Sequence, residues 1–160
     1  MIKVGDEMPQ GTFMTMTKDG PKPLTTDELF KGKTVVLFGL PGAFTPTCSA
    51  KHVPSYIQNY EALKGKGVDE IWCLSVNDAF VMGAWTRDQK AGGKIRFMAD
   101  GSAEYSKKLG LTLDLTARGM GIRANRYSML VDDGVVKTLN VEAPGKFEVS
   151  GGDTMLKQVA

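Results

Sequence analysis

The sequence predicts an α/β fold in which helices flank a central mixed β-sheet. Short apolar runs rich in β-branched residues alternate with segments of helical spacing, which is typical of a sheet whose strands are linked by helices. Towards the C-terminus, two apolar runs flank a turn signal, so an antiparallel hairpin joins the sheet and makes it mixed. A chain of 160 residues without internal repeats or a long linker suits one domain, and we expect residues 1–160 to form it.

The first half of the chain predicts an N-terminal hairpin, a buried strand and a helix. Gly11–Lys33 is rich in Thr, Lys, Pro and Gly, which indicates short hairpin strands and turns. Thr34–Leu40 is a nearly continuous apolar run, as expected of a strand buried on both faces of a sheet. After a loop at Pro41–Thr47, Cys48–Leu63 has apolar residues near helical spacing, and Pro54 predicts a kink or a late helix start.

The second half predicts two more strand–helix pairs, a hairpin and a last helix. Asn77 or Asp78 caps the first of these helices, and Gly110 ends the next one. Asp132-Asp133-Gly134 between two apolar runs is a strong hairpin signal. In chain order, the expected elements are a strand at Ile71–Val76, a helix at Ala79–Gln89, a strand at Ile95–Ala99, a helix at Glu104–Leu109, hairpin strands at Tyr127–Val131 and Val135–Val141, and a helix at Gly152–Val159.

The composition argues against several classes of protein. The 20 basic residues nearly balance the 18 acidic ones and form no block, so a nucleic-acid partner held through its phosphates is not expected. No apolar run approaches the roughly 20 residues needed to cross a membrane. Met1–Glu7 lacks the pattern of a signal peptide, so we expect a cytoplasmic protein. Two cysteines without a Cys-x-x-Cys motif, and one histidine, argue against a disulfide scaffold and against a metal site.

The most informative segment is the loop that precedes Cys48. Cys48 falls in the first turn of the predicted helix, where free backbone N–H groups and the helix dipole favour an anion. A thiol at such a place is more readily deprotonated, and the thiolate is the nucleophile. Thr45 lies close enough in sequence for its hydroxyl to reach the same pocket, while Pro41 and Pro46 stiffen the loop. The alternative is that Cys48 is a small buried hydrophobe, the commonest use of a free cysteine, and its place in the chain favours neither reading.

The motif Pro41-x-x-x-Thr45-x-x-Cys48 resembles the peroxidatic signature of the peroxiredoxins. The fuller string from Pro41 to Ser49, followed by His52-Val53-Pro54, is similar to the type II, or peroxiredoxin-five-like, subgroup. The resemblance covers nearly the whole chain in the family's order, because further similar stretches lie at residues 73–81, 121–129, 132–134 and 139–142.

The resemblance implies a thioredoxin-like fold and a thiol-dependent peroxidase that takes part in antioxidant defence. It would reduce hydrogen peroxide and organic hydroperoxides through a sulfenic acid on Cys48, without a metal or another cofactor. By the same resemblance, Thr45 orients the peroxide and bonds the sulfur. Arg126 stabilises the thiolate and the charge that develops on oxygen, and Pro41 shields the thiolate. Preorganised donors of this kind are what such a reaction needs.

The partners also follow from the resemblance. An external thiol, either glutathione with glutaredoxin or thioredoxin, would reduce the sulfenic acid. The family forms dimers, so we expect a homodimer in which Phe44 and Phe80 lie at the subunit contact. The family's apolar pocket lining corresponds to residues near Leu115 and Met120.

Two other residues compete for a role near Cys48. Arg123 is an alternative to Arg126, and we prefer Arg126 because it directly precedes Tyr127-Ser128-Met129, as in the family. His52 lies four residues after Cys48 on the same helix face, so a cysteine–histidine pair is conceivable. We favour instead a structural histidine bonded to backbone or water, because no oxyanion hole or third orienting residue is identifiable.

Cys73 is a candidate second redox cysteine. It lies inside a buried-looking strand, where an inert core thiol is the more common reading. Some members of the family carry a resolving cysteine in the C-terminal region, but Lys146–Gly151 contains none. A bridge between Cys48 and Cys73 would need Cα atoms within about 7 Å, or local unfolding. We therefore expect a cycle that uses one cysteine.

Two alternative functions remain open at this point. The first is a peroxide-sensing redox switch, in which oxidation of Cys48 changes the interaction with a partner and turnover is incidental. The second is a thiol–disulfide oxidoreductase. It is less favoured, because Ser49-Ala50-Lys51 follows Cys48 where such enzymes normally place a second cysteine.

Overall fold

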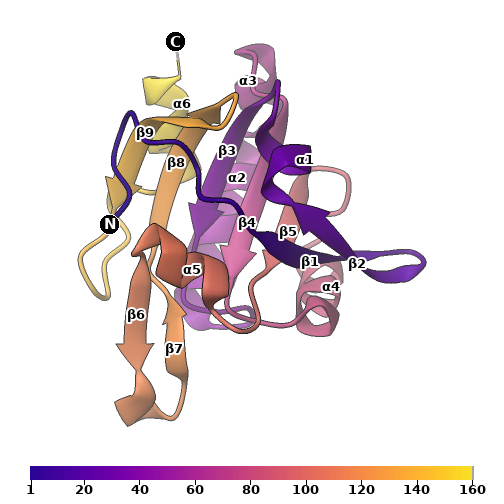
Figure 1. The fold of residues 1–160 in the computed structure, drawn as a ribbon, viewed down its shortest axis with the longest axis vertical. Helices are drawn as coiled ribbons and strands as arrows, with labels where there is room; N and C mark the ends of the chain where they lie inside the picture. Colours follow the sequence, from indigo (N-terminus) through magenta and orange to yellow (C-terminus); the bar gives the residue numbers. More distant parts are fainter. Residues whose placement is uncertain (160) are drawn as a thin grey trace.

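A computed structural model describes residues 1–159, and its centre is one seven-stranded mixed sheet (Figure 1). The strand order is β2-β1-β5-β4-β3-β8-β9. Three parallel strands form the middle of the sheet: β3 (Thr34–Gly39), β4 (Glu70–Ser75) and β5 (Ile95–Ala99). Strand β8 (Tyr127–Asp132) lies antiparallel beside β3. The predicted mixed α/β sheet is thus confirmed.

Hairpins form both edges of the sheet. The predicted N-terminal hairpin is present as β1 (Thr12–Thr17) and β2 (Gly20–Thr25), and β1 runs antiparallel to β5. At the other edge, β9 (Val135–Val141) pairs with β8. The tight turn between β8 and β9 holds Asp133 and Gly134 at φ 47° and φ 80°, the left-handed region that this dipeptide tolerates best.

Helices cover both faces of the sheet, and the side chains of each buried strand alternate between two apolar clusters. In β3, Val36 and Phe38 belong to one cluster, whereas Val35 and Leu37 belong to the other. The first cluster packs against α2 (Val53–Gln58), α3 (Tyr60–Gly65), α4 (Ala79–Asp88) and α6 (Gly152–Gln158), and the second packs against α1 (Thr26–Phe30) and α5 (Glu104–Leu109). None of the helices in residues 1–159 has both the length and the apolarity for a membrane crossing.

The short helix α1 was not predicted, because it lies within a segment whose composition favours turns. Thr25 and Glu28 form a capping box, in which each side chain bonds the backbone of the other. The apolar side chains of Leu29 and Phe30 are buried against the sheet. A five-residue helix is stabilised by such caps and contacts rather than by its own propensity.

A second, two-stranded sheet was also not predicted. It consists of β6 (Thr112–Leu115) and β7 (Gly121–Ala124), joined through a 3₁₀ turn at Thr116–Arg118. The hairpin projects from one end of the molecule (Figure 1). Its residues are largely exposed or half-buried, so the segment has no apolar run to mark it.

The segment after β3 is helical but broken, as Pro54 predicted. It opens with a π-helical turn at Cys48–His52, and α2 begins only at Val53 with Pro54 in its first turn. A second break at Asn59 separates α2 from α3 and was not predicted. The loop and the π turn lie beyond the C-terminal end of a parallel strand, where α/β sheets commonly place their sites.

Candidate active site

Cys48 is fully buried at the start of the π turn. The loop before it is fixed from two sides. The Ala43 N–H donates to Asn77 Oδ1 at 2.9 Å, and the Ser49 N–H donates to the Thr45 carbonyl at 3.0 Å. The reactive-thiol candidate therefore sits in a rigid turn that the end of β3 supplies.

Arg126 lies directly against the sulfur of Cys48. It immediately precedes β8, and because Tyr127 pairs with Gly39, it arrives where β3 ends. Its Nη2 donates to Cys48 Sγ at 3.2 Å, and the side chain is nine-tenths buried. A guanidinium is permanently charged and only donates, so this contact favours negative charge on the sulfur and on atoms bound to it.

The alternative arginine, Arg123, does not bond the sulfur. Its Nη1 donates to the Pro41 carbonyl at 3.3 Å, and its Nε donates to the Met120 carbonyl at 2.9 Å. It thereby ties the β6–β7 hairpin to the loop that carries Cys48. The preference for Arg126 over Arg123 agrees with this geometry.

The expected hydrogen bond between the Thr45 hydroxyl and the Cys48 sulfur is not formed. Thr45 Oγ1 donates instead to the Gly42 carbonyl at 2.6 Å, within the loop itself. The proton of the hydroxyl is thus committed, and its lone pairs remain available to accept a hydrogen bond from a bound molecule. Pro41 is half-buried at the start of the same loop.

His52 bonds Arg126 rather than Cys48. Arg126 Nη1 donates to His52 Nδ1 at 2.9 Å, and the other ring nitrogen, Nε2, lies 3.0 Å from the Ser150 carbonyl. Since a guanidinium has no acceptor, Nδ1 is the acceptor and Nε2 carries the proton. Both ring nitrogens are therefore occupied, and a cysteine–histidine pair is not formed. The expected backbone bond is present, whereas the contact with Arg126 was not anticipated.

Burial and the nearby charge keep His52 neutral. The side chain has no exposed surface. Burial, and next the Arg126 guanidinium, lower the pKa of His52 to about 3, although the hydrogen bond to Ser150 acts in the opposite direction. The imidazole is therefore an uncharged acceptor throughout the physiological pH range.

Glu142 supports this arrangement from behind, and neither it nor Ser150 was singled out from the sequence. The Glu142 N–H donates to the Arg126 carbonyl at 2.9 Å. Its Oε2 accepts hydrogen bonds of 2.7–2.9 Å from the backbone of Glu148, Val149 and Ser150 and from the Ser150 hydroxyl. Burial acts to raise the pKa of Glu142, but these hydrogen bonds outweigh it and lower the pKa. No local sequence signal marks a carboxylate whose hydrogen-bond donors lie 6 to 8 residues further along the chain.

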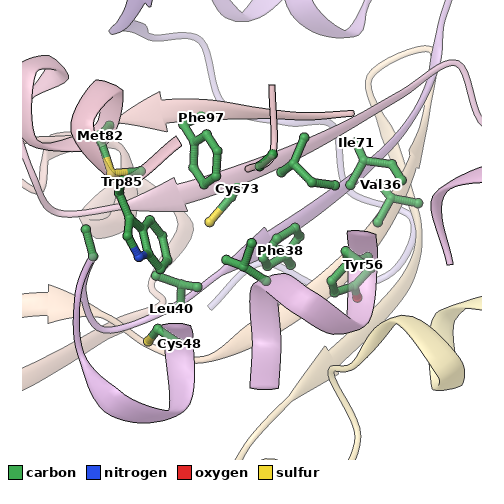
Figure 2. Close-up of a cluster of buried hydrophobic side chains, with 14 of the residues drawn as sticks. Val36, Phe38, Leu40, Cys48, Tyr56, Ile71, Cys73, Met82, Trp85 and Phe97 are labelled. Atoms are coloured by element: carbon green, nitrogen blue, oxygen red, sulfur yellow. The ribbon is translucent and has the colours of Figure 1, made fainter. Parts of the chain in front are cut away.

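Cys73 is buried inside β4, among apolar side chains. It pairs with Phe38 across the sheet and belongs to the same apolar cluster as Cys48. In Figure 2, Cys73 lies in the middle of the labelled side chains, whereas Cys48 lies at their edge. Burial, and then the neighbouring Cys48, raise the pKa of Cys73 well above its usual range, against the effect of Arg126. Both cysteines are free thiols.

Comparisons with known proteins give the family. The Redoxin family model matches residues 3–156. Peroxiredoxin-2B of Arabidopsis thaliana is 50% identical over 157 residues, which are 98% of this chain and 97% of that protein. The hybrid peroxiredoxin hyPrx5 of Haemophilus influenzae is 47% identical over 159 residues, which are 98% of this chain and 66% of that protein.

Solved structures match the whole fold. Reduced Prx3 from Vibrio vulnificus in complex with hydrogen peroxide is 51% identical, with a TM-score of 0.96 and 100% of both chains covered. A structure from Burkholderia cenocepacia is 56% identical, with a TM-score of 0.98 and coverage of 100% of this chain and 99% of that one. The Burkholderia protein is described as a thioredoxin reductase, whereas the Arabidopsis, Haemophilus and Vibrio proteins have peroxiredoxin names.

The fold and these matches define a thiol-dependent oxidoreductase, and the chain belongs to the Redoxin family. Within that family it is a type II peroxiredoxin with a thioredoxin-like fold, an antioxidant enzyme that reduces peroxides with electrons from thiols. The resemblance drawn from the motif between Pro41 and Cys48 is thereby confirmed.

Proposed function

We propose that Cys48 is the peroxidatic nucleophile of a cycle that uses one cysteine. The observation that carries the proposal is the 3.2 Å contact between Arg126 Nη2 and the fully buried Cys48 Sγ. The thiolate attacks the outer oxygen of the peroxide, an S–O bond forms and the O–O bond breaks. Cys48 becomes a sulfenic acid, and the departing oxygen takes up a proton and leaves as water or an alcohol.

The surrounding residues serve this one step. Arg126 offsets the charge of the thiolate and of the departing oxygen. Thr45, whose proton is held by the Gly42 carbonyl, accepts the hydrogen bond of the peroxide O–H and so orients it. Pro41, whose carbonyl is held by Arg123, closes one side of the turn against water.

Rapid mixing of the reduced protein with hydrogen peroxide tests the proposal. Trp85 provides the fluorescence signal, because its Nε1 donates to Ser49 Oγ at 3.1 Å, next to the reacting cysteine. Trapping and mass spectrometry should find the sulfenic acid on Cys48 alone, and Cys48→Ser should abolish the fast phase. Oxidation no faster than that of an ordinary exposed thiol would contradict the assignment.

We further propose that an external thiol resolves the sulfenic acid, either glutathione with glutaredoxin or thioredoxin. Cys73 is buried and its pKa is raised, so it is a poor internal nucleophile. Assays of peroxide consumption with each reducing system should show sustained turnover with one of them. Fast oxidation of Cys48 with poor recycling by every thiol tested would favour the redox-switch function instead.

A homodimer is proposed through the face that bears Phe44 and Phe80. These side chains are 53% and 67% exposed, and Phe80 lies on α4, the helix that also carries Trp85. The ring centres of Phe44 and Trp85 are 6.4 Å apart. Trp85 in turn bonds Ser49, the residue after Cys48, so this face is close to the proposed site. Sedimentation should show a dimer for the wild-type protein and a monomer for Phe80→Asp, because the added charge disrupts the apolar contact.

The cytoplasmic location stays a prediction.

A further inference from the structure

The Arg126 guanidinium makes hydrogen bonds in two directions. Nη2 donates to Cys48 Sγ at 3.2 Å, and Nη1 donates to His52 Nδ1 at 2.9 Å. Because a guanidinium is a rigid planar fork, fixing one of its N–H groups fixes the direction of the others. The bond to His52 therefore determines where Nη2 points.

His52 is itself held on every side. Its Nε2 donates to the Ser150 carbonyl, and its ring packs against Phe38 and Phe147 at centroid distances of 4.8 Å and 5.0 Å. The Ser150 carbonyl also accepts from the Tyr56 hydroxyl at 2.8 Å. The imidazole cannot turn without breaking a buried hydrogen bond.

The chain of contacts closes on Arg126 through Glu142. Glu142 holds Ser150 through the backbone N–H and the hydroxyl, both on Oε2. It also donates its own N–H to the Arg126 carbonyl at 2.9 Å. Arg126 is thus fixed at its backbone by Glu142 directly, and at its guanidinium by Glu142 through Ser150 and His52.

We propose that His52 is a positioning residue for the peroxidase reaction. Its Nδ1 aims the Arg126 guanidinium at the Cys48 sulfur, and Glu142 anchors the assembly. The inference rests on the proposed roles of Cys48 and Arg126. An uncharged acceptor suits this place, because a carboxylate would pair with the guanidinium and draw its charge away from the sulfur.

Three substitutions separate the two hydrogen bonds of His52. In His52→Asn the amide oxygen can replace Nδ1 as the acceptor for Arg126, whereas in His52→Gln the amide nitrogen can replace Nε2 as the donor to Ser150. His52→Phe replaces neither and keeps an aromatic ring. We expect His52→Phe to lower the rate constant with hydrogen peroxide by about tenfold to a hundredfold, the cost of a misdirected group. His52→Asn should recover most of that loss and His52→Gln little of it.

This pattern distinguishes positioning from a merely structural role. If His52 only anchored the segment around Ser150, His52→Gln would be the variant that recovers the rate, and the inference would be overturned. Urea unfolding of each variant controls for stability. Should His52→Phe fail to fold, the comparison of His52→Asn with His52→Gln still decides the question.

A double-mutant cycle with Arg126→Gln tests the proposed route of action. Arg126→Gln alone should slow the reaction by about a hundredfold, as removal of a charge-stabilising donor does. Adding His52→Phe should then cost little more, because His52 acts through Arg126. Fully multiplicative losses would refute the inference and leave the role of Arg126 intact. An unchanged rate in Arg126→Gln would instead refute the proposed function.

Discussion

His52 accepts a hydrogen bond of 2.9 Å from Arg126, and this relationship ties the protonation of the histidine to the integrity of the site. The guanidinium stays protonated, so protonation of the imidazole would bring two hydrogen-bond donors and two positive charges together in a buried space. The site is therefore built for a neutral histidine.

The free energy of unfolding should decrease as the pH is lowered, because of His52. The folded pKa of His52 is about 3, below the value of about 6.5 in an unfolded chain, so the unfolded state binds the extra proton between these values. The stabilisation is fully present above the unfolded pKa and is lost as pH falls towards the folded one. The slope of the unfolding free energy should approach about 1.4 kcal/mol per pH unit.

Urea unfolding between about pH 5 and 6.5 measures this slope, because most carboxyl groups titrate below that window. His52 is the one histidine in the chain, so few other side chains titrate in this window. His52→Gln should flatten the profile. A wild-type profile that is already flat would show that His52 is not kept neutral.

The two cysteines should differ sharply in their importance. Cys48→Ser should abolish turnover, because the hydroxyl that remains is a poor nucleophile towards peroxide. Cys73→Ser should retain much of the activity, since Cys73 is buried and its pKa is raised. Both variants are assayed for peroxide consumption with the same reductant. Equal losses would contradict the cycle that uses one cysteine.

Thr45→Val should slow the reaction with hydrogen peroxide by about a hundredfold. The substitution removes the acceptor for the peroxide O–H and the 2.6 Å bond to the Gly42 carbonyl. Thr45→Ser keeps the hydroxyl and should retain most of the rate. Alkylation of Cys48 by a reagent without an O–H group is the control and should change little. A wild-type peroxide rate in Thr45→Val would rule out the orienting role.

Two buried tyrosines should respond differently to loss of the hydroxyl. Within residues 1–159 the Tyr127 hydroxyl is buried without a hydrogen-bond partner, so Tyr127→Phe should leave stability unchanged or raise it by about 1 kcal/mol. Tyr56→Phe loses the 2.8 Å bond to the Ser150 carbonyl and should destabilise by about 1 kcal/mol. Urea midpoints measure both. A marked loss in Tyr127→Phe would mean that its hydroxyl is bonded.

The sequence predicted those elements whose local pattern is strong. The strands β3, β4 and β5 follow from apolar runs, and Gly110 ends α5 in the left-handed conformation expected of it. The hairpin of β6 and β7 escaped prediction because it is mostly solvated and has no buried face. Local patterns cannot mark an element that contributes little to the core.

The site was predictable only in part, for a different reason. Cys48 has a local signal in its loop and helix start, and Arg126 was found through the family resemblance alone. The contacts of His52 with Arg126 and of Glu142 with Ser150 depend on how distant segments meet. The resemblance assigns the Thr45 hydroxyl to the sulfur, whereas in the structure the hydroxyl donates to the Gly42 carbonyl within its own turn.

The site is complete only when β8 has paired with β3, so its formation depends on the folding of the sheet. Cys48, the proposed nucleophile, follows β3, and Arg126 precedes β8, so a chain that has formed only the parallel strands holds Cys48 without Arg126, which lies 78 positions away. A slip of one residue between β8 and β3 would send alternate side chains to the wrong face. With the proposed role of Arg126, peroxidase activity should return during refolding only after these distant segments have joined, and a partly folded molecule should react slowly with peroxide.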